Sequence, residues 1–436
     1  MTFSAYGLVI HTRQADALLA GRVYLVMALL GEMLILAGLF LTSAASGHST
    51  LMSAELKVHL VGAEDMWLPI TCLLLGFGVT AGLPFLHMWL PLAHPVAPTP
   101  ASAVLSGAMI KAGVFAWLSI LPFGMIALPT IGLMLILIGL LGAFVAGIIG
   151  LFQSLPKAVL AYSSISQMGL ITCALGAAFM APDIWNALLP ALLLFAFHHA
   201  ITKGALFLSV GLKDHYQKTS LLIISIAILV PALSLIGVFT SGIHAKLALK
   251  EALDQTTLPS WLLPSITASA LATTLLIVRF LSLLWKDKSP TPSVLPSSMA
   301  LGWGGLVVAC GIEPGVLIPE LGLDSVFSRW QYYPSLVLVP GLTLVALYFL
   351  GPHLRARLPA GDIIYPLIKI KEVCTRQVDR LTRHSLLDND TASKPRFSLP
   401  TLATLNPIEK GIQRHLYAFF GLLTLMFIVS FYLLLA

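Results

Sequence analysis

Three titratable side chains lie inside long apolar stretches, where a charge is costly unless it faces protein or water. Lys111 comes twelve residues after Thr99, whose Thr-Pro pair is typical of a helix start, so its amine lies roughly 18 Å along that helix. His199 and Lys203 are four residues apart and share one helix face. Burial favours the neutral forms of amine and imidazole, which suits these groups to proton transfer. For Lys111, a purely structural ion pair is the alternative.

Three other residues are weaker candidates. Glu32 lies in the middle of the apolar run 22–42, where a carboxylate that stays protonated or binds a neighbouring hydroxyl is the alternative. Lys157 stands at the entrance to the next apolar helix and is equally well explained as a basic anchor at the membrane surface. His198 is interpreted as a histidine satisfied within the core.

The elements that position these residues are membrane-spanning helices. The chain has 436 residues, of which 58% are hydrophobic and 10% charged, with a mean hydropathy of +0.92. Soluble proteins carry about 25% charged residues, so the composition excludes a soluble enzyme, a disordered protein and a nucleic-acid binder. At about 20 apolar residues per span, the sequence predicts an all-α polytopic bundle of about eleven spans: 22–42, 67–87, 99–121, 130–151, 158–180, 187–211, 220–240, 261–285, 299–319, 334–351 and 415–436.

The basic residues indicate the orientation. Alternating the direction of these spans places 18 of the 25 Lys and Arg on one side of the membrane, in 11–22, 88–98, 152–157, 213–219, 286–298 and 352–414. Lys and Arg accumulate on cytoplasmic loops, so we expect this side to face the cytoplasm. The localisation predicted is a multi-pass protein of a bacterial inner membrane. Within 352–414, apolar residues at helical spacing indicate an amphipathic surface helix, with a solvated linker as the alternative.

Glycine and proline interrupt two of the apolar runs. One is GFGVTAGLPFLHMWLP at 76–91, and the other is GVFTSGIHAK at 237–246, which adds Lys246 to the candidates. Two interrupted hydrophobic segments in corresponding halves of a chain are typical of a transporter's ion site. The sequence therefore predicts two broken helices that arise from inverted repeats. Its four Cys are far apart and no CxxC, Walker or GxGxxG motif occurs, so we predict no metal and no cofactor.

Several ordered segments resemble one family. Residues 83–113, LPFLHMWLPLAHPVAPTPASAVLSGAMIKAG, resemble the signature of the antiporter-like family, and 153–169, 199–211 and 239–246 resemble its further motifs in the family's order. The family comprises proton-pumping membrane subunits of respiratory complex I, related subunits of membrane-bound hydrogenases, and multisubunit sodium/proton antiporters. In this chain the signature of the first broken helix consists of Pro84, His87, Trp89, Pro91, His94 and Pro98.

The resemblance implies a function and its residues. Lys111, Lys203 and Lys246, with His199 beside them, match the family's central path for protons or Na⁺, and no redox centre of its own is implied. The partners implied are the other membrane subunits of a complex that resembles complex I or a hydrogenase. The translocating domain is expected at 1–285, followed by further spans (286–351), a cytoplasmic segment (352–414) and a last span (415–436).

The sequence also departs from the family. Thr80 occupies the position of a family lysine in the first broken helix, which in the family pairs with a Glu. The first residues, MTFSAYGLVIH, resemble the family sequence that directly follows this Glu. In the family, the Glu and about four and a half helices therefore precede the segment that corresponds to the start of this sequence. We expect one of three explanations: the start assigned at Met1 is wrong, the gene is split, or the protein is a shortened, non-pumping paralogue. The alternatives to ion translocation are a scaffold subunit without a working channel, a membrane subunit that energises inorganic-carbon uptake, and an electron carrier that binds haem through His87, His94, His198 and His199.

Overall fold

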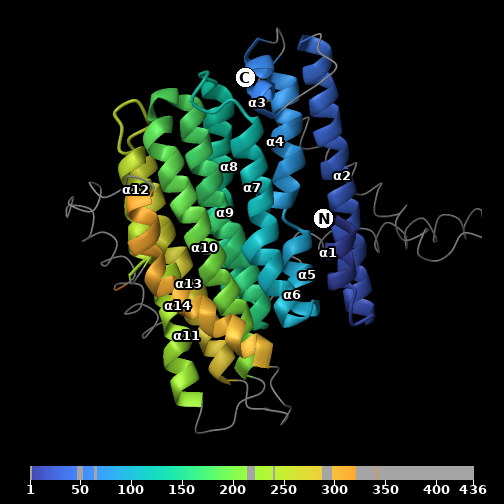
Figure 1. Cartoon of the computed structure of the whole chain (residues 1–436), viewed down its shortest axis with the longest axis vertical. Coiled ribbons are helices and arrows are strands. Elements are labelled where there is room, and N and C mark those ends of the chain that lie inside the picture. Colours follow the sequence, from blue (N-terminus) through green and yellow to red (C-terminus); the bar gives the residue numbers. More distant parts are fainter. Residues whose placement is uncertain are drawn as a thin grey trace, which may run out of the picture. The chain divides into compact units, whose positions relative to one another are not determined.

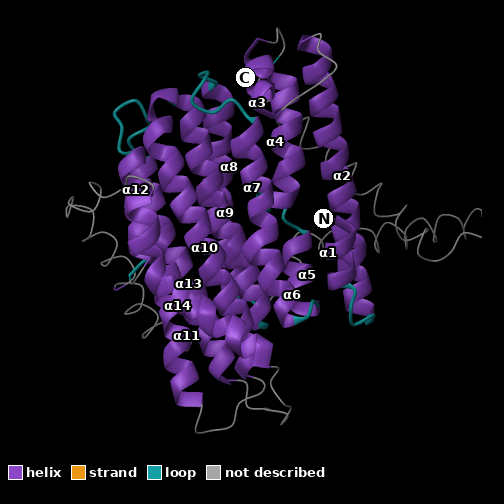
Figure 2. Ribbon diagram, in the orientation of Figure 1, coloured by secondary structure: helices purple, strands orange, loops and turns teal. Residues whose placement is uncertain are grey.

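The computed structural model describes residues 2–46, 53–62, 66–213, 221–238, 241–286, 297–320 and 341, and these form a bundle of helices joined by short loops (Figure 1, Figure 2). The predicted spans at 334–351 and 415–436, and the segment 352–414, lie outside the described residues apart from Gly341. The elements are α1 (Thr2–Val9), α2 (Ala15–Ser46), α3 (Ser53–Gly62), α4 (Trp67–Ala81), α5 (Trp89–Val96), α6 (Thr99–Val104), η1 (Leu105–Met109), α7 (Ile110–Ile120), α8 (Pro129–Leu151), α9 (Pro156–Met180), η2 (Pro182–Ile184), α10 (Trp185–Lys213), α11 (Leu221–Ile236), α12 (Ser241–Leu253), α13 (Leu262–Lys286) and α14 (Ser297–Glu320).

The described residues confirm an all-helical chain that crosses a membrane several times. Seven stretches are long and apolar enough to span a bilayer: Ala15–Ala45, Thr99–Ile120, Pro129–Leu151, Pro156–Met180, Pro182–Lys213, Ile224–Leu253 and Leu262–Lys286. Two of the predicted spans, 67–87 and 299–319, correspond to shorter apolar helices at Trp67–Ala81 and Ser298–Ile312.

Helix α9 is the centre of the bundle. It begins with Pro156 at its first position, where the missing N–H costs nothing, and its most apolar window is buried throughout. Helices α5, α8, α10 and α13 pack around it, and Figure 1 shows α2 and α4 on the opposite side of the molecule from α11, α12 and α13. Small Ala, Ser and Gly side chains on α9 let these neighbours approach closely.

The contact between α8 and α9 is a glycine seam, formed by two glycine pairs. A Cβ atom added to Gly139 would lie 2.4 Å from the carbonyl oxygen of Gly169, and the reverse contact is equally short. One Cβ at Gly132 would lie 2.6 Å from the carbonyl oxygen of Gly176. The two helices therefore touch through their backbones, which only glycine permits at these positions.

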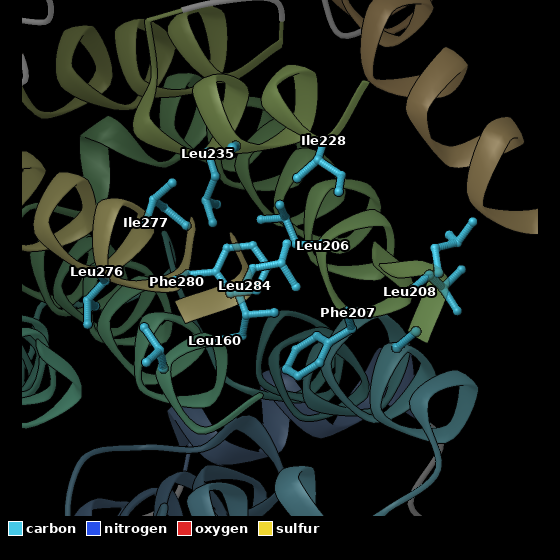
Figure 3. Packing of buried hydrophobic residues seen from close by; sticks show 14 of the residues in the cluster. Leu160, Leu206, Phe207, Leu208, Ile228, Leu235, Leu276, Ile277, Phe280 and Leu284 are labelled. Atoms are coloured by element: carbon cyan, nitrogen blue, oxygen red, sulfur yellow. The ribbon is translucent and has the colours of Figure 1, made fainter. Parts of the chain in front are cut away.

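A buried apolar cluster holds α11 and α13 against α9 and α10. Figure 3 shows its side chains converging from these four helices, with Leu160 from α9, Leu206 and Phe207 from α10, and Leu235 and Phe280 from α11 and α13. Dispersion attraction between closely packed side chains, rather than removal from water, favours such contacts between helices in a membrane. The cluster fixes the helix that carries Lys203 beside the helix that leads to Lys246.

Both predicted interruptions are present as backbone features. Helix α4 ends at Ala81 because Gly82 adopts a left-handed conformation (φ 73°), and Pro84 prevents the helix from continuing. The segment 88–98 was counted among the loops between spans, but it contains the buried helix α5, and Pro91 lies in the first turn of that helix, where proline is tolerated. The second interruption follows α11, where Gly237 has a φ of 88°.

Candidate functional site

Lys203 is fully buried on α10. Its ammonium donates a hydrogen bond to the carbonyl oxygen of Leu160 on α9, at 2.7 Å. The same carbonyl also accepts the hydroxyl of Ser164 at 3.1 Å. The lysine therefore joins the central helix of the bundle to α10 through a single backbone acceptor.

Lys111 is held by a carbonyl that a wide helical turn sets free. Residues Leu105–Met109 form a π-helical turn, in which the N–H of Ile110 reaches back five residues to the carbonyl of Leu105. In a regular α-helix this N–H would bind Ser106 instead; here the Ser106 carbonyl accepts the Lys111 ammonium at 2.7 Å. Wide turns of this type occur frequently at functional sites. The sequence contained no signal that predicted this one.

Lys246 lies at the second interruption. Its side chain is 9% exposed, and its ammonium donates to the carbonyl oxygen of Ile236, the last residue of α11. A Cβ atom on Gly237 would lie 2.5 to 3.0 Å from the end of the Lys246 side chain. Glycine is thus favoured at position 237 by its backbone conformation, and a side chain there would displace the end of the Lys246 side chain.

The three lysines share one mode of binding. Within the described part of the chain, each ammonium is held by a backbone carbonyl, and none of the three forms an ion pair with a carboxylate. Two of these carbonyls lie at places where a helix widens or stops, and such places leave acceptors unused by the helix. Each of these lysine ammonium groups is therefore stabilised by the dipole of a backbone carbonyl.

Two histidines lie among these lysines with free ring nitrogens. His199 is fully buried, neither of its nitrogens has a hydrogen-bond partner among the described residues, and it interacts electrostatically with Lys111 and Lys203. His94 on α5 is also buried with both nitrogens unpartnered there, and its ring stacks on Phe207 with the centroids 4.5 Å apart. Such groups are costly unless water or a proton donor reaches them, so this region suits internal water.

The broken-helix signature residues tie the first interruption to its surroundings. The indole N–H of Trp89 donates to the carbonyl of Val79 at 2.9 Å, which closes α5 onto α4. The backbone N–H of Phe85 donates to Nδ1 of His87. The ammonium of Lys157 donates to the carbonyl of Ala97 at 2.7 Å, next to Pro98, which precedes α6. Pro84, Pro91 and His94 lie in the same segment, between the end of α4 and the start of α6.

Glu32 and Thr80 occupy different environments from the three lysines and from each other. Glu32 is exposed on α2, where its carboxylate accepts the hydroxyl of Thr2. Thr80 is partly buried in the last turn of α4, and the α4 backbone around Ala81 packs against Gly113 of α7, two residues after Lys111. The structure therefore brings the Thr80 turn, rather than Glu32, next to the helix that carries Lys111.

The hydrogen-bond partner of His198 was not predicted from the sequence. Its Nδ1 lies 2.7 Å from the hydroxyl of Ser241, the first residue of α12. It interacts electrostatically with both Lys246 and Lys111. The Ser-Gly pair at the second interruption was the only signal in the sequence, and it does not indicate which histidine it meets.

Comparison with known proteins identifies the family of this chain. The family model described as "NADH:quinone oxidoreductase/Mrp antiporter, TM" matches residues 1–245. This chain belongs to that family. The matched residues contain both interruptions as far as α12 and two of the three lysines, Lys111 and Lys203, and Lys246 follows directly after them.

Relatives of this antiporter-like family match part of their length. Hydrogenase-4 component B of Escherichia coli is 34% identical over 226 residues, which cover 48% of this chain and 32% of the relative. NADH-quinone oxidoreductase subunit L of Neisseria meningitidis serogroup A is 33% identical over 215 residues, covering 45% and 30%. The chain thus matches about a third of the length of these relatives.

Two solved structures have the same fold. A chain of the membrane-bound sulfane sulfur reductase, an archaeal respiratory membrane complex, aligns with a TM-score of 0.58 at 21% identity, covering 79% of this chain and 71% of that chain. A chain of respiratory complex I from Thermus thermophilus aligns with a TM-score of 0.58 at 22% identity, covering 73% and 72%. Both likenesses concern the fold.

Proposed function

We propose that this protein is a proton- or cation-translocating membrane subunit of a multisubunit complex. Charge moves along the lysines Lys203, Lys111 and Lys246, with His199 between the first two. The subunit carries no redox centre of its own, and reactions in partner subunits, or a cation gradient, drive it. Family membership and the fold shared with chains of two respiratory membrane complexes support this proposal.

One observation carries the proposal. Each of the three lysines is held by a carbonyl and none by a carboxylate in the described part of the chain. A carbonyl accepts a hydrogen bond from an ammonium and from a neutral amine alike, whereas a carboxylate partner favours the ammonium strongly. A lysine held in this way can lose and regain its proton without losing its position, as a relay requires.

The proposal extends to the rest of the chain and its surroundings. We infer about eleven spans in total, two broken helices related as inverted repeats, and a translocating domain over 1–285. We infer a multi-pass location in a bacterial inner membrane, and the distribution of basic residues favours the more basic side facing the cytoplasm. The partners are other membrane subunits, because the two structural neighbours belong to complexes of many subunits.

A second function is a scaffold subunit with an inactive channel. The observation in its favour is Thr80, an uncharged residue next to the Lys111 helix at a position where the family resemblance calls for lysine. A scaffold would assemble normally and carry no ions.

Flux through the reconstituted complex tests the proposal. We would purify the complex containing the full chain and place it in liposomes loaded with K⁺ and the pH dye pyranine. Valinomycin then creates a negative-inside potential that drives proton entry, and a parallel experiment measures ²²Na⁺ uptake. Uptake of either ion above that of empty liposomes is the expected result. An assembled complex that carries neither ion contradicts translocation and favours the scaffold.

A further inference from the structure

A buried hydrogen-bond chain crosses the second interruption. His198 on α10 is 2% exposed, and its Nδ1 lies 2.7 Å from the hydroxyl of Ser241 at the start of α12. The Ser241 hydroxyl lies 3.2 Å from the hydroxyl of Ser234 on α11, and both serines are fully buried. Three helices thus contribute one proton-exchanging group each to a continuous chain.

Two of the path lysines interact electrostatically with this chain. His198 interacts electrostatically with Lys111 and Lys246, whereas His199 interacts with Lys111 and Lys203. Ser234 lies two residues before Ile236, whose carbonyl holds the Lys246 ammonium. The two adjacent histidines therefore meet different pairs of lysines, with Lys111 common to both.

Close backbone contact makes this arrangement possible. A Cβ atom on Gly242 would lie 1.6 Å from the carbonyl oxygen of Ser234 and 3.2 Å from Cε1 of His198. Any side chain at this position would separate α12 from α11 and from the imidazole. Gly242 thus lets Ser241 reach both of its partners.

We propose that His198, Ser241 and Ser234 form the proton relay that connects Lys111 with Lys246. The relay rests on the proposed function, because it carries the ion only if that ion is a proton. One proton leaves the Lys111 ammonium and one is gained by the Lys246 amine, so the charge of the pair is unchanged. His198 takes up the proton on Nε2 and releases another from Nδ1 to the Ser241 hydroxyl. Each hydroxyl passes its own proton on as it receives one, from Ser241 to Ser234 and from Ser234 to the Lys246 amine.

A structural role makes a different prediction. If His198 only anchors α12 through Ser241, glutamine should serve in its place, since its side-chain amide also donates and accepts hydrogen bonds. Glutamine does not take up a proton near neutral pH. His198→Gln therefore separates the two roles.

The test uses the full complex in pyranine-loaded liposomes under a valinomycin potential. For His198→Gln we expect proton uptake to fall about a hundredfold, with normal assembly and an unchanged thermal midpoint. Ser241→Ala should lower uptake about tenfold, as for the loss of one hydrogen bond, and Ser241→Thr, which keeps the hydroxyl, should restore it. Ser269→Ala is the matched control, because this buried hydroxyl on α13 donates only to its own helix, at the carbonyl of Ile266.

The outcomes distinguish the relay from the proposed function. Normal uptake by His198→Gln or by Ser241→Ala, in a preparation where Lys111→Ala is inactive, overturns the relay and leaves translocation intact. If His198→Gln fails to assemble, the comparison of Ser241→Ala with Ser241→Thr decides: equal uptake by the two overturns the relay. Absence of proton uptake by the unmodified complex overturns the relay, and absence of Na⁺ uptake as well overturns the proposed function.

Discussion

The ammonium of Lys203 lies 2.7 Å from the carbonyl oxygen of Leu160, inside a helix bundle and with its side chain shielded from solvent. A lysine is among the residues that proteins bury least readily without a charged partner. Here the partner is a peptide dipole on α9. Burial of Lys203 without a carboxylate partner therefore lowers the stability of the protein, and we infer that the lysine is retained for its function.

Replacement of Lys203 by methionine should make the protein more stable and less active. Apolar residues of similar volume in place of buried ionic groups are often neutral or stabilising, by about 1–4 kcal/mol. The Leu160 carbonyl keeps the Ser164 hydroxyl as a donor, so no acceptor is left unpaired. We expect a raised thermal midpoint in detergent together with loss of ion uptake. A lowered midpoint in an assembled complex would contradict this reasoning.

Lys111→Ala should abolish ion uptake and leave the complex assembled, because alanine removes the titrating group and also lowers the cost of placing this helix in the membrane. Ion uptake in liposomes and the yield of complex are the two measurements. Retained proton or Na⁺ uptake by the assembled variant would remove Lys111 from the path.

Lys57→Ala is a matched control for this substitution. The Lys57 ammonium also donates to a backbone carbonyl, that of Leu118, at the same 2.7 Å. It lies on the short helix α3, outside the candidate spans, where burial lowers its pKa from the usual value. Since Lys57 binds the last turn of α7 and no path residue, we expect its variant to retain ion uptake.

Gly139→Ala should destabilise the bundle strongly. The new methyl group would lie 2.4 Å from the Gly169 carbonyl, in a contact between two backbones that cannot yield locally. Overpacking of this kind costs about 1–3 kcal/mol or more. Gly304→Ala on α14, where an added Cβ meets nothing within 4 Å, is the control. We would compare thermal midpoints and yields of the two variants; equal values would show that the α8–α9 contact is looser than described.

Thr80→Lys should harm the protein. The α4 backbone around Ala81 packs against Gly113, close to Lys111 in sequence, so the new ammonium would be buried near an existing one without a carboxylate. An uncompensated buried charge costs roughly 3–5 kcal/mol. Assembled complex in membranes should decrease for Thr80→Lys but remain normal for Thr80→Val, which keeps the size without the charge. Normal assembly with increased proton uptake would show that a carboxylate is within reach, with Glu32 the first to test.

The sequence predicted the features that depend on residue type. Gly82 with Pro84, and Gly237 with Ser241, mark both interruptions, and the apolar surroundings of Lys203 indicate its burial. The π-helical turn before Lys111 was not predictable, because Leu105–Met109 has the composition of an ordinary helix.

Contacts between distant segments were also beyond the sequence. His198 resembles any core histidine until Ser241, 43 residues away, is placed against it. Glu32 was a candidate for the ion path, with a neighbouring hydroxyl as its alternative partner, and in the structure it is exposed and accepts the hydroxyl of Thr2. Hydropathy reports the burial of a whole segment, and the side of a helix that faces the protein depends on packing.

The seam between α8 and α9 determines which parts of the molecule are able to move. Helices usually shift past one another by rearranging the side-chain layer between them, and at Gly139–Gly169 and Gly132–Gly176 that layer does not exist. The pair is therefore a stationary frame, and the acceptor of Lys203, the Leu160 carbonyl, is built into it. Because the lysine itself belongs to α10, any sliding of α10 along this frame changes the length of that hydrogen bond. Mechanical displacement would thus be converted directly into a change in how firmly one proton is held.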